Sequence, residues 1–181
     1  LHHFLPEFSS LSGSALLRRK KSVIVSPSPP APASELSPMT DLLEPDNSTP
    51  SSALLFRDQR VLLVDDQRSF QVMMKAMLLN LGFNKVTILG SAEETRRRCQ
   101  KELFDIYLID YNLGLGENGR QLLEALREQQ KLPPEAVVFI ISGDNSRSMV
   151  LSALESEPDG YMMKPFSQEQ LRQRLQRALQ R

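Results

Sequence analysis

The sequence predicts an α/β domain with a doubly wound, five-stranded parallel sheet flanked by five helices. From Gln59 onward, short apolar runs alternate with stretches of helical periodicity, and the pair occurs five times in succession. The apolar runs are almost continuous, as is typical of parallel strands that are covered on both faces. Because strand-to-strand crossovers are right-handed, such units form an open sheet with helices on both sides.

The first strand is predicted over residues 61–64, where Val-Leu-Leu-Val is apolar throughout. Apolar side chains then recur at helical spacing from Phe70 to Leu81, which predicts one amphipathic helix. Gly82 follows the last of them, in the position where glycine commonly ends a helix. The second strand is predicted over residues 85–89.

A capping box begins the second helix, since Ser91 is followed three residues later by Glu94. The third strand is predicted over residues 106–109. A glycine-rich connection at residues 113–119 then leads into the third helix. The apolar face of that helix holds Leu122, Leu123 and Leu126.

The fourth strand, residues 137–141, is the most apolar of the five, and a helix with apolar positions over residues 149–154 follows it. A short fifth strand is predicted over residues 161–163. Ser167 and Gln170 form a second capping box at the start of the last helix. The buried face of this helix is predicted to hold Leu171, Leu175, Ala178 and Leu179.

The composition changes sharply near Arg57. Eight of the twelve prolines lie before it, among many serines, and such a stretch cannot bury enough apolar area to offset its loss of chain entropy. We therefore predict a disordered N-terminal tail over residues 1–57 and one folded domain over residues 58–181. Because the chain begins with Leu1 and its first methionine is Met39, one hypothesis is that native translation starts at Met39.

Bulk composition excludes several classes of protein. Basic and acidic residues balance at 22 each, so no overall field draws the chain to nucleic acid or to an anionic membrane. No apolar run approaches the roughly 18 residues that a transmembrane helix needs. The single cysteine, Cys99, has no partner for a disulfide within the chain, which fits a reducing compartment. A cytoplasmic protein that binds neither membrane nor nucleic acid directly is expected.

Polar side chains follow four of the five predicted strands. In open α/β sheets the ligand site lies beyond the carboxyl ends of the strands, where the strand order reverses. Asp65 and Asp66 follow the first strand, Asp110 the third, Ser142 the fourth and Lys164 the fifth. Three carboxylates, a hydroxyl and an ammonium are thus predicted to meet at one rim of the sheet.

The predicted cluster suits phosphoryl transfer to a carboxylate. Three crowded carboxylates repel one another, so they retain a proton or bind a cation. Hard oxygen ligands without clustered histidine or cysteine favour Mg²⁺ over zinc. With Mg²⁺ and a lysine beside a free carboxylate, catalysis consists mostly of positioning and neutralisation of charge. A carboxylate nucleophile then yields an acyl phosphate.

These residues lie in segments that resemble the two-component receiver family. The resemblance rests on residues 61–66, 105–110, 140–143 and 160–166. It implies a flavodoxin-like sheet with the strand order 2-1-3-4-5. It also implies that Asp110 is phosphorylated and binds Mg²⁺ together with Asp65, Asp66 and the backbone carbonyl of Asn112.

The resemblance implies roles for three more side chains. Lys164 would pair with the phosphoryl group and with Asp110. Ser142 would move inward and donate its hydroxyl to a phosphoryl oxygen. Tyr161 would swing between an exposed and a buried rotamer, and its position would report that movement. The peptide bond between Lys164 and Pro165 is expected to be cis.

The implied function is that of a response regulator. It would be a signalling phosphoacceptor rather than an enzyme, although it assists its own phosphorylation and dephosphorylation. The phosphodonor would be a sensor histidine kinase or a phosphotransfer protein. The fourth predicted helix, the fifth strand and the last helix would form a surface that binds a downstream protein, and a phosphorylation-dependent dimer is one form that this output can take.

Other functions fit the sequence less well. A phosphatase of the haloacid dehalogenase type needs an acid two residues after the nucleophile, where this chain has Asn112. No Gly-Lys-Ser/Thr phosphate loop occurs, and the two histidines, His2 and His3, both lie in the predicted tail. The arginines at 96–98 are expected on a solvated helix face. Two alternatives stay open: a fragment of a longer receiver-containing regulator, and a receiver-like scaffold that acts without phosphorylation.

Overall fold

A computed structural model describes residues 55–114, 116–144 and 146–181. Five strands form one sheet in the order β2-β1-β3-β4-β5, and each neighbouring pair is parallel. The predicted fold class and strand order are therefore confirmed. The strands are β1 (Arg60–Val64), β2 (Lys85–Leu89), β3 (Ile106–Asp110), β4 (Val137–Ser142) and β5 (Gly160–Met163).

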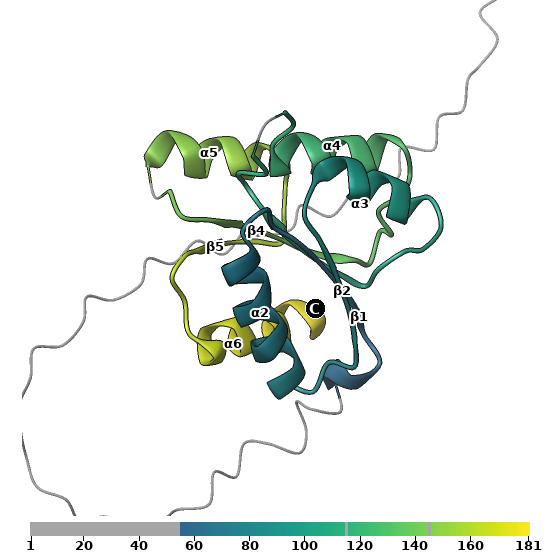
Figure 1. Ribbon diagram of the computed structural model, residues 1–181, viewed down its shortest axis with the longest axis vertical. Coiled ribbons are helices and arrows are strands. Elements are labelled where there is room, and N and C mark those ends of the chain that lie inside the picture. Colours follow the sequence, from purple (N-terminus) through teal and green to yellow (C-terminus); the bar gives the residue numbers. More distant parts are fainter. Residues whose placement is uncertain (1–54, 115, 145) are drawn as a thin grey trace, which may run out of the picture.

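Five helices alternate with these strands, as the sequence predicted. They are α2 (Arg68–Asn80), α3 (Ala92–Cys99), α4 (Gly119–Glu128), α5 (Arg147–Glu155) and α6 (Gln168–Leu179). Helices α2 and α6 cover one face of the sheet, and α3, α4 and α5 cover the other (Figure 1). The result is a three-layer arrangement in which all loops that follow the strands emerge at one rim.

Side chains of the central strands divide between two apolar layers. In β1, Val61 and Leu63 pack in the layer of α2 and α6, whereas Leu62 and Val64 pack in the layer of α3 and α4. Successive residues of a strand point to opposite faces, so a strand covered on both sides must be apolar at every position. This requirement explains the unbroken Val-Leu-Leu-Val run that marked the strand in the sequence.

Helix ends follow the local sequence closely. Gly82 has φ 99, a conformation that a residue without Cβ adopts easily, and Phe83 N donates to Leu78 O as α2 ends. The capping box of Ser167 and Gln170 is confirmed at the start of α6. The predicted box at α3 is only half right, because Ser91 Oγ caps the helix while the Glu94 carboxylate accepts from Gly90 N instead.

The predicted tail of residues 1–57 includes three residues that the structure describes as folded. Leu55, Phe56 and Arg57 form a helical turn before β1, and Phe56 is 0% exposed. The Phe56 ring stacks on Phe83, with ring centroids 4.7 Å apart. Two apolar residues at the end of a Pro/Ser-rich stretch carried too little periodicity to be assigned to the core. The rest of the predicted tail, including the Met39 hypothesis, lies outside the described residues.

Among the residues that the structure describes, no helix is both long and apolar enough to span a bilayer. The longest of the alternating helices, α2, has 13 residues. A span of the hydrocarbon core needs about 20 residues at the helical rise. The described helices instead pack one face against the sheet.

Removal of the Phe56 ring tests whether Phe56 belongs to the folded core. Phe56→Ala is expected to lower the free energy of unfolding by about 3 kcal/mol, since it leaves a cavity beside Phe83. Urea unfolding followed by circular dichroism measures the change. Arg57→Ala, at an exposed neighbour, is the matched control and is expected to have little effect. Equal stability of the two variants would show that Phe56 adds nothing to the core, in agreement with the tail predicted over residues 1–57.

Candidate functional site

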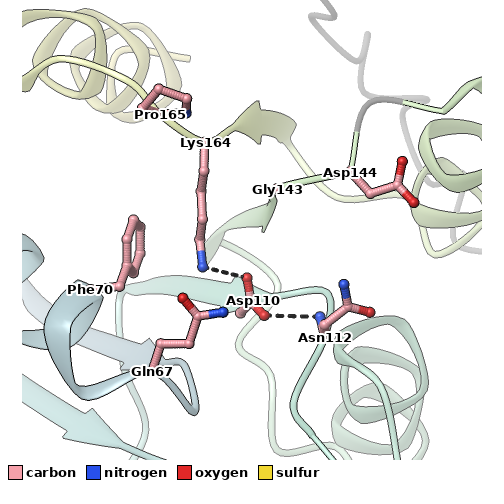
Figure 2. A pocket seen from close by; sticks show the side chains of 8 residues that line it. All are labelled: Gln67, Phe70, Asp110, Asn112, Gly143, Asp144, Lys164 and Pro165. Atoms are coloured by element: carbon pink, nitrogen blue, oxygen red, sulfur yellow. Dashed lines mark hydrogen bonds and ion pairs between the residues drawn. The ribbon is translucent and has the colours of Figure 1, made fainter.

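An open cleft of about 670 Å³ lies at the carboxyl rim of the sheet. Residues at the end of β3 and in the segments that follow β1, β3, β4 and β5 contribute to it, and of the predicted site residues the lining includes Asp110, Asn112 and Lys164. Figure 2 shows Lys164 reaching down to Asp110 at the floor, with Asn112 beside it. The cleft is lined by Gln67, Phe70, Asp110, Asn112, Gly143, Asp144, Lys164 and Pro165.

Lys164 joins the ends of β1 and β3. Its Nζ lies 2.6 Å from Asp65 Oδ2 and 2.7 Å from Asp110 Oδ1. Asp65 is 0% and Asp110 is 4% exposed, so one ammonium neutralises charge on two carboxylates that have left water. A buried carboxylate without such a partner would be strongly destabilising. The bond between Lys164 and Pro165 is cis, as the resemblance implied.

Each buried carboxylate also accepts a hydrogen bond from the backbone two residues further on. Gln67 N donates to Asp65 Oδ1 at 2.8 Å, and Asn112 N donates to Asp110 Oδ2 at 2.9 Å. Both aspartates therefore present one oxygen to Lys164 and the other to an N–H group. This pairing fixes the orientation of both carboxylates at the floor of the cleft.

Burial raises the pKa of Asp110 from 3.8 to about 6. The hydrogen bond and the charge of Lys164 act against burial and lower this pKa, while the charge of Asp65 adds to the increase. Asp110 is thus ionised at neutral pH. It is also more basic than an ordinary aspartate.

Asp66 lies apart from this pair. It is exposed at the rim, and a Cβ placed on Gly114 would lie 3.2 Å from Asp66 Oδ2. In the described ranges, no three side chains of the His, Cys, Asp or Glu type converge closely enough to hold a metal ion. The expected crowding of three carboxylates is therefore not what the structure shows, because Lys164 occupies the space between two of them.

The donor chemistry nevertheless fits Mg²⁺. The cleft lining holds the carboxylates of Asp110 and Asp144 and no imidazole or thiol. Asp65 and Asp66 lie next to it, at the end of β1. Mg²⁺ prefers such hard oxygen ligands and keeps several of its waters, which an open cleft accommodates. Two carboxylates that share a single ammonium still carry a net negative charge, which favours a further cation.

Ser142 and Tyr161 are brought together through Asp144. Ser142 is buried, and its Oγ accepts from Asp144 N at 3.1 Å. Tyr161 is 6% exposed and donates its hydroxyl to Asp144 O at 2.7 Å. Burial raises the pKa of Tyr161, and a side-chain hydrogen bond with Ser142 opposes that increase. Of the exposed and buried positions expected for the Tyr161 ring, the structure has the buried one.

Five residues at or beside the site were not predicted to belong to it, among them Gln67, which lines the cleft. Residue 119 must be a glycine because its backbone lies close to that of Asp110: a Cβ there would lie 2.1 Å from Asp110 O. Asn118 and Gln121 form a capping box that begins α4 beside it, and their spacing was a usable signal. Phe70 lines the cleft although it was predicted only as part of the apolar helix face. Nothing in the helical period distinguishes a core residue from one whose ring also reaches the cleft.

The receiver-domain profile, described as "Response regulator receiver domain", matches residues 61–176. The chain therefore belongs to this family of two-component signalling modules. Phosphorylation on an aspartate and binding of Mg²⁺ are general properties of the family. The match covers all five strands and reaches into α6.

Two similar sequences and one similar solved structure support the assignment. Chemotaxis protein CheY-3 of Vibrio cholerae serotype O1 is 27% identical over 129 residues, which cover 71% of this chain and 98% of the relative. DNA-binding response regulator MtrA of Mycolicibacterium paratuberculosis is 31% identical over 123 residues, 68% of this chain and 52% of the relative. The solved structure of Vibrio cholerae chemotaxis protein CheY4 aligns with TM-score 0.60 at 26% identity, covering 66% of this chain and 98% of that one.

The raised pKa of Asp110 predicts a pH-dependent stability. The folded state holds the Asp110 proton more tightly than the unfolded state, so ionisation costs stability; the cost is absent below about pH 4 and complete above about pH 6. With a chelator present, Asp110→Asn is expected to be more stable than the parent by about 1–3 kcal/mol at pH 7. The difference should vanish near pH 4.

Urea unfolding at a series of pH values measures this difference. Glu128→Gln, an exposed position at the end of α4, is the control for loss of one negative charge. A constant difference between Asp110→Asn and the parent from pH 4 to pH 7 would contradict the raised pKa.

Proposed function

We propose that this chain receives a phosphoryl group on Asp110 from a sensor histidine kinase or a phosphotransfer protein, with Mg²⁺ as cofactor. The observation that carries the proposal is the contact of Lys164 Nζ with both Asp65 and Asp110 at the floor of an open cleft. This contact places the Lys164 ammonium beside the basic, ionised carboxylate of Asp110, and the open cleft lets a phosphodonor approach from solvent. Family membership supports the same reaction.

The proposed transfer needs Asp110 as a free carboxylate. One Asp110 oxygen forms a bond to phosphorus while the bond between phosphorus and the donor histidine nitrogen breaks, and the imidazole keeps that electron pair. With a pKa of about 6, Asp110 is mostly ionised at neutral pH and remains a better nucleophile than an ordinary aspartate. Its buried position keeps competing water from most of its surface.

Mg²⁺ would be held by Asp65, Asp66, Asp110 and the backbone carbonyl of Asn112. When bound, it supplies positive charge that neutralises the oxygens of the transferring group. Lys164, in the connection between β5 and α6, supplies a second positive charge. Its ammonium would pair with the phosphoryl group once Asp110 has been modified.

The proposed switch uses Ser142 and Tyr161. Ser142 Oγ lies at the end of β4 and would turn its hydroxyl toward a phosphoryl oxygen. That turn would weaken its bond with Asp144 N, and Asp144 O is the acceptor for Tyr161. A change at the phosphate would therefore reach the ring in β5, within the surface of α5, β5 and α6.

This surface of α5, β5 and α6 is the proposed contact for a downstream protein. Leu151 on α5 is a large apolar side chain left exposed, and its burial against a partner would be favourable. We propose a cytoplasmic regulator that acts through protein contacts, including dimerisation on phosphorylation, with no direct nucleic acid or membrane contact. The arginines at 96–98 fit this view, since they pair with Glu117, Glu93 and Glu102.

Acetyl phosphate offers a direct test. With Mg²⁺, the parent chain is expected to gain one phosphoryl group by intact-mass measurement, and removal of the metal with a chelator should abolish the gain. Asp110→Ala should gain none, whereas Asp58→Asn, at an exposed aspartate before β1, should behave as the parent. A parent chain that stays unmodified would favour the scaffold alternative.

Lys164 is expected to matter more for switching than for acceptance. Lys164→Ala should be phosphorylated roughly tenfold more slowly, because one charge-assisted contact is lost. The backbone amide shifts that phosphorylation induces in α5, β5 and α6 of the parent should be absent from its NMR spectrum. Lys101→Ala, at an exposed lysine, is the control. Persistence of those shifts in Lys164→Ala would disprove the assigned role.

A further inference from the structure

The Phe70 ring lies against the ammonium of Lys164. Nζ lies over the ring, 3.8 Å from its centroid. Figure 2 shows the ring standing beside the Lys164 side chain at the wall of the cleft. The face of an aromatic ring is electron-rich and attracts an ammonium within about 6 Å of its centroid. The contact is therefore a cation–π interaction at the candidate site.

The ring completes the set of groups around Lys164. An ammonium has three N–H donors, and the carboxylate oxygens of Asp65 and Asp110 lie within hydrogen-bond distance of Nζ. The ring covers a further side of Nζ, and the Lys164 side chain is only 15% exposed. Cation–π attraction is stronger where water is excluded, so the ring is well placed to hold this charge.

The core holds the ring itself in place. Phe70 is 8% exposed and belongs to the apolar layer of α2 and α6. It meets Phe166 edge to face, with centroids 6.0 Å apart and planes at 83°. Phe166 follows Lys164 by two residues, so one ring contacts two side chains of the connection between β5 and α6. Movement of the ring away from Lys164 would disturb that packing.

We infer that Phe70 is a positioning residue, whose ring face holds the Lys164 ammonium in the cleft when phosphoryl transfer changes the carboxylates that also hold it. The inference rests on the proposed function, because modification of Asp110 is what removes one of the lysine's partners. With the ring as a constant partner, the ammonium stays beside the phosphoryl oxygens. Without it, Lys164 turns more easily toward solvent.

Ring fluorination tests this role, because fluorine withdraws electron density from the ring face and changes the ring size little. Phe70 is replaced in the full chain by phenylalanines with one, two and three ring fluorines. The rate of phosphorylation by acetyl phosphate with Mg²⁺ is then measured. We expect a stepwise fall that reaches roughly two- to fivefold with three fluorines, which is smaller than the tenfold fall expected for loss of Lys164 itself. A rate that does not depend on fluorination overturns the inference.

Phe83 provides a matched control, since its buried ring stacks on Phe56 near the start of β2 and is not part of the cleft. Trifluorination of Phe83 is expected to leave the rate unchanged, and an equal fall would overturn the inference. In a Lys164→Met chain, fluorination of Phe70 should not alter the residual rate. A fall that persists without the ammonium would also overturn it.

An NMR measurement reports the contact without any phosphorylation. Protons of the Lys164 ε-methylene group lie near the ring, so their signals should be shifted upfield by the ring current and should return to ordinary values in Phe70→Leu. Ordinary values in the parent overturn the inference even if the chain is phosphorylated. A parent chain that shows the upfield signals but accepts no phosphate overturns the proposed function instead.

Discussion

A single ammonium between two buried carboxylates is the contact on which the rim of this sheet depends. Asp65 and Lys164 are 99 positions apart in the sequence, yet Nζ and Oδ2 lie 2.6 Å apart. Neither aspartate would be stable as a buried anion alone. The doubly wound sheet makes the contact, since β1, β3 and β5 end at the same rim. Fold and site are therefore linked by charge compensation.

The placement of the site residues could be predicted because it follows from strand ends. Each central strand has an apolar run, so the first polar residue after that run marks the rim, as Asp65 and Ser142 do. Parallel pairing then brings those positions together without any knowledge of side-chain geometry. The five strands, their order and the cis bond before Pro165 followed from the same residues and the family resemblance.

What could not be predicted depends on contacts that leave no periodic signal. Phe56 lies in a Pro/Ser-rich stretch, and its full burial and its stacking on Phe83 show that it belongs to the core. Whether Asp66 joins Asp65 and Asp110 in a close group of three depends on side-chain geometry, which strand ends do not specify, and in the described residues it does not. Phe70 occupies an ordinary apolar helix position, and its second contact with the ammonium appears only in three dimensions.

The turn that contains Phe56 precedes β1, and the Arg181 guanidinium pairs with Asp159, immediately before β5. Arg57 and Arg181 therefore lie at the amino edge of the sheet, whereas the cleft opens at its carboxyl edge. A dye or an affinity handle placed at either of these exposed positions would stand on the remote side of the folded domain. Immobilised or labelled protein would keep its cleft facing bulk solution, available to reagents and to large donors.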